Sequence, residues 1–291
     1  MAADPSFLHD VKTYYDKNTK RFARHHDSGV VDALHRGVWA PEVTTQEEAF
    51  QYVNRLLLQA IETLTPRFST PLRVLDLGCG VGGSLFYLAQ HLPVEATGVT
   101  LSPVQVELAN ERARALQVER QCRFIEADFL HLPNLEPHPA VFAIESFVHC
   151  PDAAQFFIVA SSVIPSGGRL ILCDDVLTSP ADIHLDPKAR RYLSDFQRGW
   201  HLRSLMATPH LQALAANAGL TLIGNRDLTP YLALQSRWDR FIALCVSLGR
   251  WLPLRAPWWL NWVGGNGAQM CLLAGVTAYR FLVFEKEYET L

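Results

Sequence analysis

The chain has 291 residues, 49% hydrophobic and 19% charged, so it has ample apolar material for a large core and little sign of long disorder. Its formal net charge of −3 argues against nucleic acid as a partner, because a nucleic-acid-binding protein must neutralise many phosphates. Six cysteines occur singly, with no C-x-x-C pair, which is typical of reduced thiols and argues against zinc or a disulfide framework.

The N-terminal stretch is mixed polar and lacks the apolar centre of a signal peptide. No uninterrupted apolar run reaches the roughly 18 residues that a transmembrane helix needs. We therefore expect a cytoplasmic protein without a membrane span.

Residues 1–70 are expected to form a helical lid segment. The clearest helix covers 47–64, where apolar side chains recur every three or four residues along one face. Pro66 follows and ends it. The rest of the chain, 71–291, is expected to form the core domain.

From residue 72 onward, short apolar runs alternate with helical stretches. The predicted strands are 72–77, 94–99, 122–126, 139–145, 168–176, 220–227 and 279–285. The predicted helices between them are 83–91, 103–116, 152–164 and 208–218, the last with Gly219 as its C-terminal cap. This alternation predicts an α/β fold with a parallel sheet covered on both faces.

Two stretches, 178–207 and 228–278, are longer than the sheet requires. With the N-terminal helices, they are expected to form a lid over the carboxyl ends of the strands, where such sheets bind ligands. The second is rich in Trp, Leu and Pro, which favours hydrophobic packing of the lid over a substrate wall. A membrane-surface contact is less favoured, because Pro253 and Pro257 interrupt any long amphipathic helix.

The segment DLGCG at 76–80 lies where the first strand turns into a helix. Glycines at such a turn allow positive φ and let a ligand approach the backbone closely. Gly78, Gly80 and Gly83 also satisfy G-x-G-x-x-G, so a nicotinamide-dependent oxidoreductase is a distant alternative. The Asp76 carboxylate decides against it, because it would repel a pyrophosphate but suits a cationic sulfonium and a primary amine.

These residues resemble the first motif of class I S-adenosylmethionine-dependent methyltransferases. GVTLSPVQV at 98–106 is similar to the second-strand segment of the sterol, tocopherol and cyclopropane-type enzymes. The resemblance implies a Rossmann-like, seven-stranded sheet, mostly parallel with the last strand antiparallel, and S-adenosyl-L-methionine as cofactor.

The resemblance also assigns cofactor contacts. Many class I enzymes end the second strand with an acid that holds the ribose, and this chain has none there; Thr100 and Gln105, with Leu101, take that place. Asp128 is expected to accept from the adenine amino group with Phe129 near the ring, and a helix cap is the alternative for Asp128.

The segment IESFVHCP at 144–151 resembles the I-E-A-T-C-H-A-P segment of sterol C-methyltransferases. Glu145 is the candidate base and His149 the second; a helical turn after Glu145 would aim both the same way. The alternatives are that Glu145 holds the amino-acid end of the cofactor or a lid amide, and that His149 is a buried structural histidine. The expected acceptor-facing aromatic residues are Tyr14, Tyr15, Trp39, Phe147 and Trp200.

Asp174 and Asp175 end the fifth strand. We expect these two carboxylates to pair with arginines of the lid or to cap the next segment, rather than to bind a metal ion or contact the acceptor. The lid carries Arg190, Arg191, Arg198 and Arg203. We expect most of these arginines to be solvated or paired with acidic residues. The alternative is that some of them bind a diphosphate group of the acceptor, in which case Mg²⁺ would also be expected. No metal ligand is assigned.

The leading hypothesis is C-methylation of an isoprenoid alkene, whose carbocation would need aromatic faces and one base. The alternative is O- or N-methylation of a small secondary metabolite. Either way the expected partner is a small lipophilic molecule, and a homo-oligomer stays open.

Overall fold

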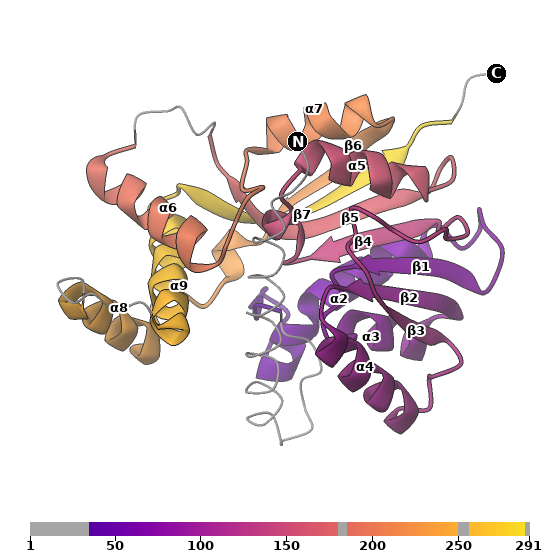
Figure 1. Cartoon of the computed structure of the whole chain (residues 1–291), viewed down its shortest axis with the longest axis horizontal. Helices are drawn as coiled ribbons and strands as arrows, with labels where there is room; N and C mark the ends of the chain where they lie inside the picture. Colours follow the sequence, from indigo (N-terminus) through magenta and orange to yellow (C-terminus); the bar gives the residue numbers. More distant parts are fainter. Residues whose placement is uncertain (1–34, 180–184, 250–255, 289–291) are drawn as a thin grey trace.

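The computed structural model describes residues 35–179, 185–249 and 256–288, over which strands and helices alternate (Figure 1). The strands are β1 (Leu72–Leu77), β2 (Val94–Thr100), β3 (Cys122–Glu126), β4 (Ala140–Ile144), β5 (Arg169–Leu177), β6 (Leu220–Asp227) and β7 (Thr277–Lys286). The helices are α2 (Gln46–Glu62), α3 (Gly83–His91), α4 (Pro103–Ala115), α5 (Ala153–Ser162), α6 (Pro187–Gly199), α7 (Thr208–Asn217), α8 (Arg237–Gly249) and α9 (Pro257–Leu273). Two short 3₁₀ helices are η1 (Phe147–His149) and η2 (Thr229–Tyr231).

The strands form one sheet in the order β3-β2-β1-β4-β5-β7-β6. Strands β1 to β5 pair in parallel, and β7 lies antiparallel between β5 and β6. This confirms the predicted Rossmann-like sheet. The strand order reverses between β1 and β4, so their carboxyl ends flank the crevice where such sheets bind ligands.

Helices cover both faces of the sheet. In Figure 1, α2, α3 and α4 lie below it and α5 and α7 above it. One buried cluster includes Tyr52 and Phe86 on the first face, and another includes Phe156 and Phe157 on the second. Burying one such side chain stabilises the fold by about 1.5–3 kcal/mol relative to leaving it exposed, so these layers hold the strand ends rigidly.

The N-terminal part follows the prediction only in part. Helix α2 begins after Thr45, which forms a capping box with Glu48, and this fits the predicted helix 47–64 closely. Residues 35–45 were expected to be helical but form an extended segment, in which Val38 bridges to Leu232. The Val38 amide donates to the Ala49 carbonyl in α2, and the Trp39 amide donates to the Tyr231 carbonyl in η2, so this backbone is hydrogen-bonded without a helix of its own. Residues 1–34 lie outside the described residues.

The two predicted insertions form one helical lobe beside the sheet, with α6 and α8 both packed on α9 (Figure 1). Helix α6 crosses α9 at glycines: a Cβ on Gly199 would come within 2.5 Å of the Gly264 Cα. Only glycine allows this approach, so the crossing is tightly specified. Within the described residues, no helix is both long and apolar enough to cross a bilayer.

Candidate active site

The loop after β1 has the backbone that its glycines predict. Gly78, Gly80 and Gly82 have φ of +93°, +53° and +89°, values that L side chains rarely adopt. A Cβ on Gly78 would overlap the side chain of Ser146, whose hydroxyl donates to the Leu77 carbonyl at 2.6 Å. A Cβ on Gly80 would meet nothing within 4 Å. The loop therefore packs against the end of β4 on one side and leaves open space on the other.

Asp76 lies at the end of β1 with only 4% of its surface exposed. Burial raises the pKa of its carboxyl group well above the ordinary value. A carboxylate in this setting gains a great deal from a cation or ammonium group placed beside it. Its role as a cofactor contact stays a prediction, and its environment suits that role.

Thr100 and Gln105, five residues apart, meet at the end of β2. The Thr100 hydroxyl donates to the Gln105 side-chain oxygen at 2.6 Å, and both residues are buried. Helix α4 makes this possible, because it begins directly after Ser102, whose side chain caps it by accepting from the Gln105 amide. Leu101 lies between them and is half-buried. The two polar side chains thus form a preorganised pair at the end of β2, and their contact with the ribose stays a prediction.

Asp128 makes local contacts, but it begins a turn and does not cap a helix as the alternative interpretation predicted. Its carboxylate accepts from the Leu130 amide at 2.9 Å and lies 3.0 Å from His131 Nδ1. The neighbouring Phe129 ring packs edge-on against Phe156, with centroids 5.5 Å apart. Asp128 therefore shapes its own loop, and its contact with adenine stays a prediction.

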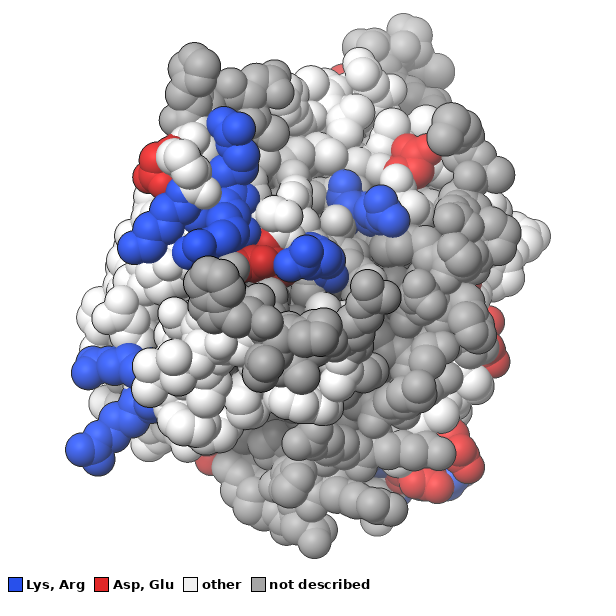
Figure 2. Space-filling model, turned by 60° about the vertical axis from the view of Figure 1, so that its left-hand side comes forward, with Lys and Arg blue, Asp and Glu red and all other residues white. Residues whose placement is uncertain are grey.

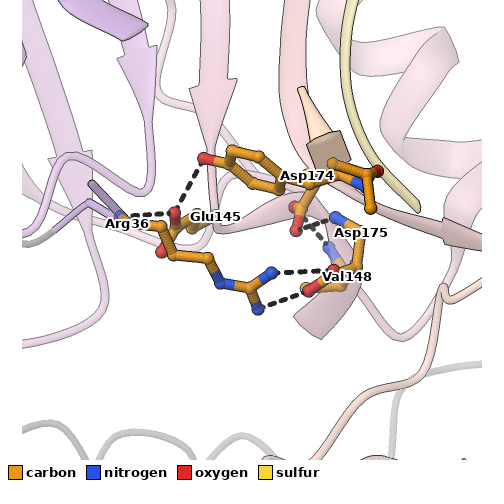
Figure 3. A network of polar contacts seen from close by, with 7 residues as sticks. Arg36, Glu145, Val148, Asp174 and Asp175 are labelled. Atoms are coloured by element: carbon orange, nitrogen blue, oxygen red, sulfur yellow. Dashed lines mark hydrogen bonds and ion pairs between the residues drawn. The ribbon is translucent and has the colours of Figure 1, made fainter. Parts of the chain in front are cut away.

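Glu145 follows β4 directly and is the centre of a polar network (Figure 3). Its Oε1 accepts from the Arg36 backbone amide at 2.9 Å and from the Tyr279 hydroxyl at 2.7 Å. Burial, with nearby charges, raises the pKa of Tyr279 well above the usual value, so this phenol keeps its proton and donates. The backbone of Glu145 has φ +52°, a conformation that costs a non-glycine residue about 1–3 kcal/mol. The carboxylate is therefore held in place at the expense of local strain.

The expected helical alignment of Glu145 with His149 is wrong. The 3₁₀ helix η1 begins only at Phe147, after the left-handed turn at Glu145, so the two side chains are not on one helical face. Burial lowers the pKa of His149 to about 4, partly offset by the backbone of His201 and Trp200. His149 is neutral at pH 7 and is a weak base, which leaves Glu145 as the better candidate.

Asp175 pairs with an arginine, as the favoured interpretation predicted; the partner is Arg36, from the N-terminal segment 1–70, and not one of the named arginines of 178–207. The guanidinium contacts both carboxylate oxygens, at 2.8 and 2.5 Å. Burial would lower the pKa of Arg36, but Asp175 and Glu145 outweigh it and raise that pKa above its ordinary value. The Arg36 guanidinium lies 5.6 Å from the Trp200 ring and 5.1 Å from the Tyr279 ring.

Asp174 completes the network from beneath. Its carboxylate accepts from the Val148 amide at 3.1 Å and the Asp175 amide at 3.0 Å, so it caps η1 (Figure 3). Burial and the neighbouring Asp175 raise its pKa well above the ordinary value. Asp174 is a structural anchor for the turn after Glu145.

The structure redistributes the expected aromatic residues. Trp200 lies beside the network, 5.6 Å from the Arg36 guanidinium, and its role as an acceptor face stays a prediction. Phe147 is only 2% exposed and its ring centroid is 4.9 Å from that of Phe156, so its expected role as an acceptor face is corrected to core packing. Trp39 is 41% exposed, its backbone amide donates to the Tyr231 carbonyl, and its expected role also stays a prediction. Tyr14 and Tyr15 lie outside the described residues.

Three residues of the site escaped prediction: Arg36, Tyr279 and His35. His35 Nε2 lies 2.8 Å from the Ser84 hydroxyl at the start of α3, and burial lowers the His35 pKa. Tyr279 reaches the site because β7 pairs it with Asp175. The strand register predicts that Tyr279 lies at the site, but only after β7 has been placed between β5 and β6.

Among the described residues, no group of three or more His, Cys, Asp or Glu side chains is arranged to hold a metal ion. Arg190, Arg191 and Arg198 are exposed on α6, and Arg198 pairs with Asp195 at 3.0 Å. These positions agree with the favoured interpretation of solvated or paired lid arginines.

Comparison with known proteins identifies the type of site. Residues 74–168 match the family profile of a methyltransferase domain. A methyltransferase, GfsG, of Streptomyces halstedii is 30% identical over 225 residues, which cover 77% of each chain. The 27-O-demethylrifamycin SV methyltransferase of Amycolatopsis mediterranei is 34% identical over 200 residues, which cover 68% of this chain and 70% of that protein.

The fold is shared with solved structures of lower identity. The geranyl diphosphate C-methyltransferase of Streptomyces coelicolor A3(2), solved with Mg²⁺, geranyl diphosphate and S-adenosyl-L-homocysteine, superposes with a TM-score of 0.69. It is 17% identical, and the match covers 98% of this chain and 99% of that one. At this identity the likeness concerns the fold alone.

Proposed function

This chain belongs to the S-adenosylmethionine-dependent methyltransferases, and within that family we propose that it methylates a hydroxyl group on a small lipophilic molecule. The observation that carries the proposal is Glu145, a carboxylate held by two donors at the carboxyl end of β4. The relative at 34% identity supports the choice of oxygen, because its name places the transferred methyl on an oxygen.

The residues around the loop after β1 fit the cofactor. Asp76 offers a buried carboxylate to its ammonium or sulfonium group, and Thr100 with Gln105 offers a polar pair to its ribose. The open space over Gly80 accommodates its backbone contacts. When bound, S-adenosylmethionine supplies an electrophilic methyl group.

Glu145 is the proposed general base of this reaction. Methyl transfer to a hydroxyl oxygen leaves that oxygen with a proton that a base must take. Both hydrogen bonds that the described residues make with the Glu145 carboxylate fall on Oε1. Glu145 would take the hydroxyl proton as the acceptor oxygen bonds to the methyl group; S-adenosylmethionine, held by Asp76, Thr100 and Gln105, would supply that methyl and would retain the electron pair of the S–CH₃ bond.

The charge of the network argues for an acceptor without a diphosphate. Glu145 and Asp175 bring two carboxylates, while Arg36 is already engaged by Asp175 in a bidentate pair. A diphosphate needs several unengaged cations or a metal. The half-buried ring of Trp200 instead favours an apolar acceptor body.

C-methylation of an isoprenoid alkene is the second candidate. The Trp200 ring, which already lies 5.6 Å from the Arg36 guanidinium, is a face that also suits a carbocation. In that reaction Glu145 would remove a proton from carbon.

The test is incubation of the full chain with methyl-labelled S-adenosylmethionine and a panel of hydroxylated lipophilic compounds, sterols and prenyl diphosphates, with and without Mg²⁺. We expect label on oxygen without a need for added Mg²⁺. Label on a carbon would replace the first candidate by the second, and a requirement for both a diphosphate and Mg²⁺ would contradict the charge argument.

A further inference from the structure

The outer face of α8 is apolar and unusually exposed. Trp238, Phe241, Leu244 and Leu248 recur at helical spacing and are 58%, 48%, 58% and 67% exposed. The opposite face of the helix, including Val246, packs on α9 through Trp259 and Val263. Helix α8 is therefore anchored on one side and presents large apolar side chains to its surroundings on the other.

The exposed face continues onto α9. Trp238 and Trp258 both contact Trp262 edge-on, with centroids 6.1 and 5.5 Å apart, and Trp258 is itself 48% exposed. We name Trp238, Phe241, Leu244, Leu248 and Trp258 the lid patch. With side chains of about 150–250 Å² roughly half exposed, it offers on the order of 500 Å², near the upper end for monomeric proteins.

Basic side chains border the lid patch. Arg237 and Arg240 are exposed on α8, and the nearby acid Asp239 is engaged at the helix start, where it accepts from the Ser236 amide at 2.8 Å. The exposed side of α6 adds four more cations: Lys188, Arg190, Arg191 and Arg198. Figure 2 shows Lys and Arg side chains at the upper left and at the lower left of this face, with uncharged described residues between them and a few Asp and Glu side chains beside the upper ones. The chain as a whole carries a net charge of −3, so this concentration of positive charge is local.

We propose that the lid patch docks the protein on an anionic lipid surface, with its apolar side chains in the interface and the basic side chains of α8 and α6 on the headgroups. Aromatic and leucine side chains together with arginines on one short helix are what such an interface binds. A second copy of the chain is a poorer occupant, because the one acid of α8, Asp239, already accepts from the Ser236 amide and is not placed to meet the bordering Arg237 and Arg240 of another copy. Docking on a lipid surface does not depend on the proposed function. The idea that docking brings a lipophilic acceptor to the active site does rest on that function.

The experiment is flotation of the full chain with vesicles of phosphatidylcholine alone and of phosphatidylcholine mixed equally with phosphatidylglycerol. We expect binding to the anionic vesicles that weakens with salt. Phe241→Ser with Leu248→Ser should weaken it more than about tenfold, since both apolar contacts are lost. Arg237→Gln with Arg240→Gln should weaken it about 30-fold, since each basic residue near an anionic surface contributes roughly fivefold.

The matched control is Ile158→Ser with Ile223→Ser, which removes apolar side chains 55% and 51% exposed on α5 and β6. This variant should bind vesicles like the parent chain. All variants are checked for S-adenosylmethionine affinity, which reports an intact fold and does not depend on docking. Absence of binding to anionic vesicles, or equal loss in the control, would overturn the proposal. The proposal would also be overturned if sedimentation velocity showed a dimer of the parent chain that the variant Phe241→Ser with Leu248→Ser dissociates. A second copy of the chain would then occupy the lid patch.

Discussion

The cofactor side and the acceptor side of the site are built in different ways. On the cofactor side, each candidate residue lies at the end of its own strand or within the few residues that follow it, as Thr100 and Gln105 do at the end of β2 and the start of α4. On the acceptor side, the network joins Arg36, Glu145 and Tyr279, which are 109 and 134 residues apart along the chain. The cofactor side is thus specified locally, whereas the acceptor side depends on the whole sheet being assembled.

The two sides are therefore expected to differ in function: the cofactor side binds the methyl donor, and the acceptor side determines the substrate and the transfer step. A locally built cofactor side can be shared by many enzymes of this fold, because a strand and the turn after it suffice to form it. The acceptor side also involves the extended segment at residues 35–45, the lid at Trp200 and the last strand, so a change in any of these alters it. Substitutions on the cofactor side should therefore weaken the binding of S-adenosylmethionine. Substitutions on the acceptor side should lower the stability of the fold or the rate of methyl transfer.

The largest effect on stability is expected on the acceptor side, from Arg36→Met. It removes the partner of Asp175, a carboxylate whose side chain is 3% exposed. Leaving one member of a buried pair alone costs about 3 kcal/mol or more, which denaturant unfolding measures as a lower free energy of unfolding. The double variant Arg36→Met with Asp175→Asn should recover most of the loss. A single variant as stable as the parent would show that the pair does not hold the segment.

On the cofactor side, Asp76→Asn should reduce S-adenosylmethionine affinity about 100-fold or more, because a buried charge partner of the cofactor is lost. Titration calorimetry measures it. Asn is nearly isosteric, so the fold should be retained, and an unchanged affinity would remove Asp76 from the site.

The same variant gives a pH test in the absence of cofactor. Burial raises the pKa of Asp76 above its unfolded value of about 4. Its contribution to folding is therefore fully present below pH 4 and is lost as the pH rises through the folded value. Asp76→Asn should flatten this fall in the free energy of unfolding, and a slope equal to that of the parent would contradict the assignment.

A smaller effect is expected from Tyr279→Phe, which removes one of the two donors to Glu145 and leaves the ring in place. One hydrogen bond to a charged group is worth about 1.5–3 kcal/mol, so kcat should fall roughly tenfold or more while donor affinity stays unchanged. A fall in donor affinity with kcat unchanged would instead place Tyr279 on the cofactor side.

These differences also explain how far sequence reasoning reached. The strands were predictable to within one or two residues at most ends, because apolar runs and capping residues such as Ser102 and Asp152 mark their limits locally. The glycine loop was predictable for the same reason. Arg36 and Tyr279 were not, because their roles depend on the pairing of β5 with β7 and on an extended segment that carries no periodic pattern. Phe147 was misassigned because the turn at Glu145 directs the following residues into the core.

The most direct test of the account is Glu145→Gln, followed by single-turnover methyl transfer and donor titration on the same preparation. Gln keeps the shape and can still accept from Tyr279, but it cannot take a proton. The account predicts a rate about 10²–10⁴-fold lower with unchanged S-adenosylmethionine affinity. A near-native rate would show that Glu145 is not the base, and a large loss of donor affinity would place it on the cofactor side instead.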